Sequence, residues 1–210
     1  MHTTFKERLG GFSIVLGAIL FAVYSALFTV LLPISHGRYD YVEVVLNPNW
    51  TRLALIAVIG ILLMLVGFYA VYTRLRDEGG ITAAIGFLFI EAAYLLQACK
   101  VSWELFLYPV IASHPESAFL LREGIIKHAP AVKIFYTLSA STIFIGIVLF
   151  CYSLFRSPQY PNSAAVLIFV GALVYALGPV LSLNASIAGI FTLAIGCSLL
   201  GVRLFKPQIA

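Results

Sequence analysis

Four polar side chains stand close together in the apolar stretch EAAYLLQACKVSWELF, and they are the residues of this chain best placed to do chemistry. Glu91, Gln97, Lys100 and Glu104 supply two carboxylates, an amide and an ammonium group. A charge at the middle of a membrane costs at least about 2.5–3.5 kcal/mol, so ionisable groups there usually serve a ligand, an ion or a proton. The candidate ligand or proton site therefore comprises Glu91, Tyr94, Gln97, Lys100 and Glu104.

Depth in the membrane sets Glu91 apart from the other polar residues. It lies near the middle of the apolar segment, and it shares a helical face with the small residues Ala84, Ala98 and Ser102. Small residues let helices approach closely, so we expect this face to be buried against a neighbouring helix. A neutral Glu91, hydrogen-bonded to a tyrosine or a backbone carbonyl, fits a structural role. A proton, ion or ligand role stays open as the alternative.

Lys100 and Glu104 lie towards one end of the same segment, on a second polar face that also carries Gln97. Their spacing of four residues predicts an ion pair. A lysine near the end of a span extends its amine to the membrane surface. We therefore expect this pair to be a structural or solvated feature of a wet rim.

The elements that position these residues are membrane-spanning helices. Of the 210 residues, 61% are hydrophobic and only 10% are charged, whereas soluble domains carry about 25% charged residues. The mean hydropathy of +1.01 applies to the whole chain and leaves no room for a separate soluble domain. The sequence therefore predicts an all-α fold, a polytopic helical membrane protein with a single domain over residues 1–210.

Six apolar segments approach or exceed the roughly 20 residues that cross about 30 Å of hydrocarbon. Gly79 and Gly80 interrupt the chain between the second and third segments, and Pro130 begins the fourth. The pattern predicts a bundle of six transmembrane helices with spans at about 10–34, 52–74, 81–108, 131–155, 163–182 and 185–205.

A short helix is also expected between the third and fourth spans, at about 114–123. Ser113 and Glu116 have the spacing of a capping box, and Gly124 is a stop signal. The apolar side chains between them favour a helix that lies on the membrane surface.

The distribution of lysine and arginine predicts how the chain is oriented. In a six-span bundle, seven of these residues lie on the side of the termini, in short segments beside span ends, against five on the other side. Short, basic segments of this kind usually stay in the cytoplasm. We therefore expect a multi-pass protein of the cell membrane with both termini cytoplasmic.

Motifs for most kinds of catalysis and cofactor binding do not occur in the chain. There is no HExxH, GxSxG or P-loop sequence. No histidine lies at the middle of a span, which disfavours a transmembrane haem, and no cofactor is expected. The basic residues form no stripe of the kind that binds nucleic acid. No metal site is expected, and its only weak candidates are external: His36, His114, Glu116 and His128.

Three segments, NPNW, GFYAVYTRLRDEGG and WELFLYPVIASHP, resemble a group of small prokaryotic membrane proteins with six spans. The likeness extends over most of the chain. It implies six spans and a prokaryotic membrane, and it implies no activity and no functional residue.

Three functions stay open. The missing catalytic motifs favour a non-catalytic integral membrane protein, either an accessory subunit of a membrane complex or a binder of lipid or another apolar ligand. Its partners would be membrane lipids, and other subunits or further copies of the chain. The second function is a small transporter or proton-coupled carrier that uses Glu91. The third is a membrane-embedded enzyme with an external-face site drawn from Glu104, His114, Glu116 and His128. The sequence disfavours an enzyme, but an enzymatic function stays open.

Overall fold

A computed structural model of the chain describes residues 5–33 and 40–206. Nearly all of these residues are helical and none is in a strand, so the all-α fold class is confirmed for the part described. The helices are α1 (Phe5–Leu31), α2 (Tyr41–Leu46), α3 (Trp50–Ser102), the π-helix η1 (Trp103–Leu107), α4 (Tyr108–Ser113), α5 (Pro115–Arg122), α6 (Ile125–His128), α7 (Pro130–Arg156), α8 (Asn162–Leu181) and α9 (Leu183–Leu204).

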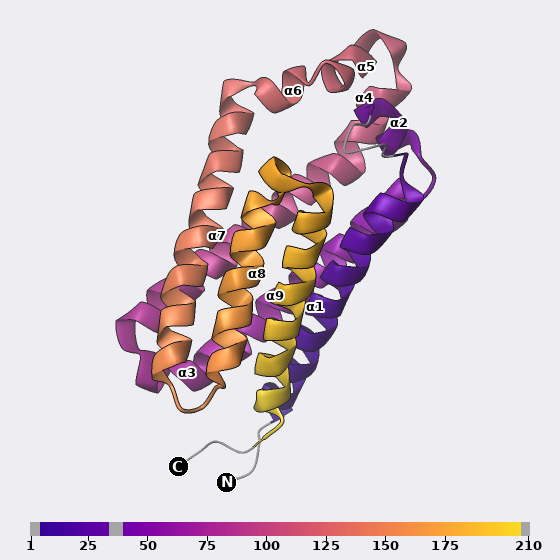
Figure 1. The fold of residues 1–210 in the computed structure, drawn as a ribbon. Coiled ribbons are helices and arrows are strands. Elements are labelled where there is room, and N and C mark those ends of the chain that lie inside the picture. The colour runs from indigo at the N-terminus through magenta and orange to yellow at the C-terminus, as the bar shows by residue number, and fades with distance from the viewer. Residues whose placement is uncertain (1–4, 34–39, 207–210) are drawn as a thin grey trace.

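The long helices run lengthwise in one bundle, and short helices gather at one of its ends (Figure 1). We call the end formed by α2, α4, α5 and α6 the cap. The opposite end, where α1 begins and α9 ends, is the base. The start of α1 and the end of α9 are in close contact there, since the backbones of Gly11 and Gly201 meet.

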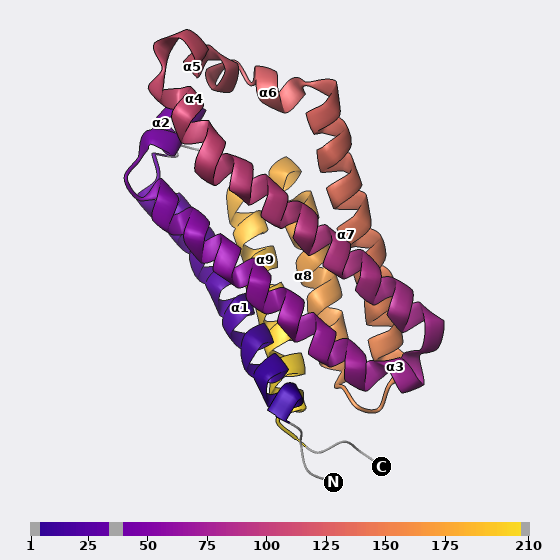
Figure 2. The same ribbon diagram turned by 180° about the vertical axis from the view of Figure 1, so that it is seen from behind.

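Helix α3 is a hairpin of two helices that turns at the base (Figure 2). At Gly80, φ is 55° and ψ is −145°, a backbone conformation that L side chains rarely adopt. The two halves then run back along each other. Near the turn, the ring of Tyr72 stacks on that of Phe87, with 4.4 Å between centroids. Near the cap, the indole N–H of Trp50 donates to the backbone carbonyl of Glu104 at 2.9 Å. The break predicted between the second and third apolar segments is therefore confirmed.

Replacing Gly80 by alanine is expected to lower the free energy of unfolding by about 1–3 kcal/mol. A Cβ at this position would meet no atom within 4 Å, so the cost comes from the backbone conformation and not from a clash. Ile81→Ala is the matched control, because the Ile81 side chain is 78% exposed in the same turn. SDS titration of the purified variants in detergent measures both. A Gly80→Ala variant as stable as the parent would contradict the expected strain.

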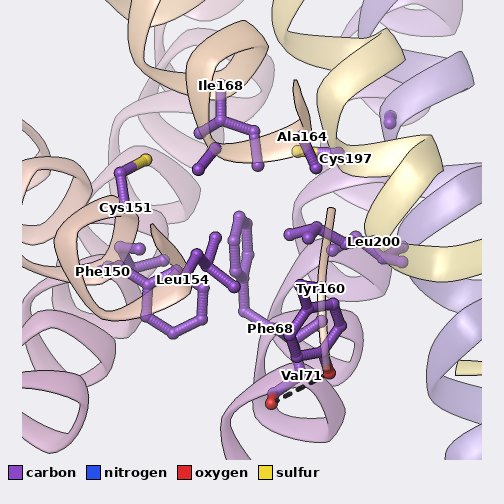
Figure 3. Packing of buried hydrophobic residues seen from close by; sticks show 14 of the residues in the cluster. Phe68, Val71, Phe150, Cys151, Leu154, Tyr160, Ala164, Ile168, Cys197 and Leu200 are labelled. Atoms are coloured by element: carbon purple, nitrogen blue, oxygen red, sulfur yellow. Dashed lines mark hydrogen bonds between the residues drawn. The ribbon is translucent and has the colours of Figure 1, made fainter. Parts of the chain in front are cut away.

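The largest apolar cluster holds the helices together towards the base (Figure 3). Phe150 of α7 packs edge-on against Phe68 of α3, with 5.6 Å between ring centroids. Ile168 of α8 belongs to the same buried cluster. Tyr160, in the connection between α7 and α8, donates its hydroxyl to the backbone carbonyl of Val71 at 3.3 Å. Helices α7 and α8 are therefore both fixed to α3 at this depth.

A polar network at the base joins α9 to α1 and α3. Arg74 of α3 donates from Nη1 to the carbonyl of Arg203 at 2.8 Å and from Nη2 to that of Lys206 at 2.6 Å. Its Nε lies 3.3 Å from Oε1 of Glu7. The last carbonyls of a helix have no partner within the helix, and Arg74 supplies donors to the end of α9 from a neighbouring helix. One turn further along α3, Glu78 accepts hydrogen bonds from the connection between α7 and α8.

Four helical runs in the described residues are long and apolar enough to cross a membrane, namely Phe5–Leu31, Trp50–Ser113, Pro130–Arg156 and Leu183–Leu204. By the same measure α8 is apolar but shorter. These runs support a helical membrane protein by their length and composition. The predicted count of six, and the single domain, stay predictions.

The short helix expected between the third and fourth apolar segments is present as α5, but its predicted cap is wrong. The residue that precedes α5 as its N-cap is His114, and it makes no side-chain capping bond. Ser113 is the last residue of α4, and its hydroxyl donates to the carbonyl of Val110 at 2.9 Å. Gly124 follows α5 with φ at 68°, the left-handed conformation expected of the stop signal.

Candidate functional site

A cavity of about 430 Å³ lies between the cap and the long helices. Its wall combines apolar side chains of α5 and α6 with polar side chains from α2, α3, η1, α4, α6 and α7. The lining residues are Tyr41, Lys100, Glu104, Tyr108, Leu120, Leu121, Gly124, Ile126, Lys127 and Tyr136. Two of the five residues predicted from the sequence, Lys100 and Glu104, are among them.

The π-helix η1 places Glu104 in the wall of this cavity. The N–H of Tyr108 donates to the carbonyl of Trp103, five residues back. Pro109 has no N–H, and in a regular helix its ring would clash with the carbonyl four residues earlier. The widened turn avoids that clash but leaves the carbonyl of Glu104 without a helical donor. The indole N–H of Trp50 donates to this carbonyl instead, at 2.9 Å. Single π-turns of this kind occur frequently at functional sites.

Lys100 and Glu104 form the predicted ion pair, with 3.1 Å between Nζ and Oε1. The hydroxyl of Tyr41 also donates to Glu104 Oε1, at 3.2 Å. The expected wet rim is wrong for Glu104, whose side chain is only 7% exposed, against 32% for Lys100. The reason is that α2 lies over this end of α3, which a helical wheel of α3 alone does not show. The pair is therefore largely buried, and Lys100, its more exposed member, faces the cavity.

An ion pair between Asp40 and Arg122 joins α2 to α5 in the cap. Nε of Arg122 donates to Oδ2 of Asp40 at 2.7 Å, and Oδ1 of Asp40 accepts from the N–H of Val42 at 2.9 Å. Asp40 thus caps α2 and connects it to the end of α5. Burial of the carboxyl opposes its charge, but the Arg122 hydrogen bond and charge and the Val42 N–H outweigh this and lower the pKa of Asp40 below its usual range.

The cap is therefore expected to loosen when Asp40 is protonated. Because the pKa of Asp40 is lower in the folded state, its stabilising effect is complete above the ordinary aspartate pKa of about 3.9 and is lost as the pH falls further. Amide hydrogen exchange in α2 and α5, corrected for intrinsic rates, should rise below about pH 4. The Asp40→Asn variant should exchange fast at every pH. A parent whose cap exchange is independent of pH would contradict this role.

The other residues predicted for the site lie outside the cavity. Gln97 donates from Nε2 to Oγ of Ser139 on α7, at 3.4 Å. Tyr94 packs its ring against Phe21 and Phe68. The five predicted residues thus lie along one helix, and the structure brings only Lys100 and Glu104 together in a cavity.

The face of α3 that carries Glu91 is not the buried face, contrary to the expectation. Glu91 is half-buried, and so are the small residues that share its face. The fully buried stripe lies to the other side. It comprises Ala83, Gly86, Ile90, Ala93 and Val101 of the second half of α3, and it continues to Glu104 of η1. Oε1 of Glu91 is nevertheless buried, and it has no hydrogen-bond partner within the described residues. The expected bond to a tyrosine or a carbonyl is therefore absent at this oxygen.

Among the described residues, the external candidates do not form a metal site. No group of three or more histidine, cysteine, aspartate or glutamate side chains in residues 5–33 and 40–206 is placed to hold a metal ion. His114 contacts its neighbour Ser113 and the carbonyl of Val110. None of His114, Glu116 and His128 lines the cavity. His36 lies outside the described residues.

Several residues of the cavity were missed by the sequence analysis. Tyr41, Tyr108 and Tyr136 have the positions of ordinary interfacial tyrosines, and Lys127 has the position of a loop lysine. Tyr108 and Tyr136 share a hydrogen bond that joins α4 to α7. One sequence feature could have indicated this site, namely Pro109, because a proline inside an apolar helix requires an irregular turn before it.

Comparison with known proteins gives no relative from which a role could be transferred. The chain matches no protein-family model, no curated protein and no solved structure.

Proposed function

We propose that the chain is an integral membrane protein that crosses the membrane six times. The continuous run from α3 to α4 has 64 residues, which at about 1.5 Å per residue is roughly three times the 30 Å of a hydrocarbon core. The hairpin at Gly80 supports counting this run as two crossings. Helix α8, with 20 residues, is just long enough for another. Helices α1, α7 and α9 complete the six.

An even number of crossings accords with the shared location of the start of α1 and the end of α9 at the base. In this proposal the base faces the cytoplasm and the cap faces outwards, as the distribution of basic residues predicts. Helix α5 then lies on the outer membrane surface, with Phe119, which is 45% exposed, as a contact with lipid.

Within this arrangement we propose that the protein is non-catalytic and binds a lipid or another apolar ligand in the cap cavity. The cavity is the observation that carries the proposal. Its volume of about 430 Å³ lies within the range of about 300–1,000 Å³ that is usual for small-molecule sites. Its wall offers Leu120, Leu121 and Ile126 to an apolar ligand, and a few polar groups to orient it. The apolar bundle surfaces would contact lipid or, if the protein is an accessory subunit, other chains of a complex.

Lipid binding to the purified, delipidated protein tests this function. A ligand present at a hundred times its Kd should stabilise the protein by about 2.7 kcal/mol. Leu120→Trp fills the cavity and should abolish that gain. Phe119→Trp is the control, because Phe119 is the exposed neighbour of Leu120 on α5 and does not line the cavity. If no lipid or amphiphile stabilises the parent, the cavity is not a ligand site.

A small transporter or proton-coupled carrier is the second candidate, and Glu91 is the observation that favours it. A mid-span carboxyl with one buried oxygen that has no hydrogen-bond partner in the described residues is available to a proton or a cargo group. In this case Glu91→Gln should fold with the stability of the parent and abolish proton-coupled uptake into proteoliposomes. Glu116→Gln, at an exposed position of α5, should leave uptake unchanged. If Glu91→Leu matches the parent in stability and uptake, Glu91 is incidental.

A further inference from the structure

The ion pair between Lys100 and Glu104 leaves hydrogen-bonding capacity unused on both of its members. An ammonium group has three N–H donors, and Glu104 Oε1, at 3.1 Å, is the one partner of Lys100 Nζ among the described residues. Oε1 also accepts from the hydroxyl of Tyr41. The second carboxylate oxygen, Oε2, has no partner in the part of the chain that the structure describes. The pair can therefore donate from Lys100 and accept at Glu104.

This unused capacity is accessible to a ligand in the cap cavity. Both residues line the cavity, and the side chain of Lys100 is 32% exposed. Within residues 5–33 and 40–206, the fully buried side-chain atoms that lack a partner are Nε of Arg74 and Oε1 of Glu91. Oε2 of Glu104 is not one of these atoms, so it is not closed off by the surrounding protein.

A wholly apolar ligand would satisfy neither member of the pair. Leu120, Leu121 and Ile126 offer such a ligand an apolar wall, but it would take water away from Lys100 and Glu104 without replacing the hydrogen bonds. Displacing an ordered water with a group that cannot reproduce its bonds loses affinity, and the loss is larger for charged groups. The ligand therefore needs a polar group at the pair and an apolar part against α5 and α6.

The charges in the cavity wall favour a polar group that is neutral. Glu104 balances the charge of Lys100, so an ionic ligand at the pair would bring a charge that has no counter-charge there and is costly to remove from water. Lys127 also lines the cavity, but it is exposed, and the interactions of exposed charges are weakened by water. The pair is thus a neutral end of the cavity with strong hydrogen-bonding groups.

A hydroxyl group matches this end of the cavity with a single atom. Its oxygen accepts hydrogen bonds while its O–H donates one, so it can accept from Lys100 Nζ and donate to Glu104 Oε2. The two charged groups are neighbours, with 3.1 Å between Nζ and Oε1, which suits one ligand atom that contacts both. The N–H and C=O of a trans amide point in opposite directions, so an amide does not serve two adjacent partners in this way.

Building on the proposed function as a binder of apolar ligands, we propose that the cap cavity is a site for a neutral amphiphile with a hydroxyl head group, of the class of long-chain alcohols and monoacylglycerols. The hydroxyl lies between Lys100 and Glu104, and the adjoining part of the chain contacts Leu120, Leu121 and Ile126. The proposed function requires only an apolar ligand in this cavity. The additions are the hydroxyl group and the ion pair that recognises it.

The head group is tested with a set of ligands that share one alkyl chain: dodecanol, dodecyl methyl ether, dodecanoate and dodecylammonium. Each is titrated into the delipidated full-length protein in a non-ionic detergent at about pH 8, where the carboxylate is ionised. The affinity follows from the rise in thermal stability with ligand concentration. The ether keeps an acceptor oxygen for Lys100 but has no O–H to donate to Glu104.

Dodecanol should bind at least about tenfold more tightly than the ether, because the ether lacks a hydrogen bond to a charged group. It should also bind more tightly than either ion. Equal binding of all the ligands would overturn the hydroxyl and leave the proposed function standing. Tightest binding of dodecanoate, lost in Lys127→Gln, would show an anion site and overturn the proposal as well. If no ligand of the set binds the parent, the proposed function fails too.

Glu104→Gln tests whether the pair recognises the head group. The amide oxygen keeps the bond from Tyr41, so an NH₂ donor takes the place of Oε2 and the charge of Lys100 is no longer balanced. The variant should lose the preference for dodecanol over the ether and bind dodecanoate more tightly than the parent does. Glu43→Gln is the matched control, since Glu43 is exposed on α2 and does not line the cavity. An unchanged preference in Glu104→Gln would overturn recognition by the pair.

Discussion

Replacing Arg74 by methionine is expected to lower the free energy of unfolding by about 3–5 kcal/mol, the usual cost of breaking a buried ion pair by removing one partner. The Arg74 side chain is 1% exposed, and that of Glu7 is 13% exposed. Methionine fills much of the same space but supplies no donor. The variant therefore removes the Arg74 charge from beside a largely buried carboxylate, and it removes the donors to the carbonyls of Arg203 and Lys206.

Arg74→Lys should recover only part of this loss. The planar guanidinium donates to two carbonyls at the end of α9 while its charge lies beside Glu7 of α1. A lysine amine is a compact group that cannot span the same acceptors in one position. The partial recovery separates the loss of charge from the loss of geometry.

Arg76→Met is the matched control for Arg74. Arg76 lies two residues further along α3, and it pairs with Asp77 at 3.4 Å, with side-chain exposures of 62% and 84%. Pairs exposed to this degree contribute about 0–1 kcal/mol. SDS titration of the three variants and the parent measures the differences. An Arg74→Met variant no less stable than Arg76→Met would mean that the base network contributes little to folding.

Arg74 also illustrates what the sequence does not reveal. From the sequence alone it belongs to a set of basic residues that mark the cytoplasmic side of a span. Its partner carbonyls lie 129 and 132 residues away along the chain, and backbone carbonyls carry no residue-type signal. The helices themselves were predictable, because apolar length, the Gly79-Gly80 pair and Pro130 are local features.

The sequence predicted that Glu91 is buried and that Glu104 lies at a wet rim, whereas Glu104 is the more buried of the two. The reason for this error is related. A helical wheel ranks the faces of a single helix, whereas burial depends on what packs against each face. The half of α3 after Gly80 is covered by α7, where Gly146 meets Ile90, and by the cap near Glu104. A usable signal was the stripe of Ala83, Gly86, Ile90 and Ala93, whose spacing matches a packed helical face.

The second large effect on the free energy of unfolding is expected at the ion pair between Lys100 and Glu104 in the cavity wall. Replacing Lys100 by methionine is expected to cost about 3 kcal/mol, at the lower end of the range for buried pairs, because the lysine side opens to the cavity. The variant leaves the buried Glu104 carboxylate with the Tyr41 hydroxyl as its remaining hydrogen bond of those described above. Glu104→Gln should cost only about 1–2 kcal/mol, since the amide oxygen still accepts from Tyr41 and the freed lysine, 32% exposed, reaches water.

The double variant Lys100→Met/Glu104→Gln distinguishes a buried pair from a wet one. Once Glu104 is neutral, methionine at position 100 no longer leaves a charge uncompensated. The double variant should therefore be more stable than Lys100→Met alone, with a coupling energy between the two changes of about 1–3 kcal/mol. The bond from Trp50 to the Glu104 carbonyl is a backbone contact and survives in all three variants, so the π-helix is retained and the comparison reports on charge. Additive single changes of less than about 1 kcal/mol each would instead identify a solvated surface pair, one of the two alternatives that the sequence left open.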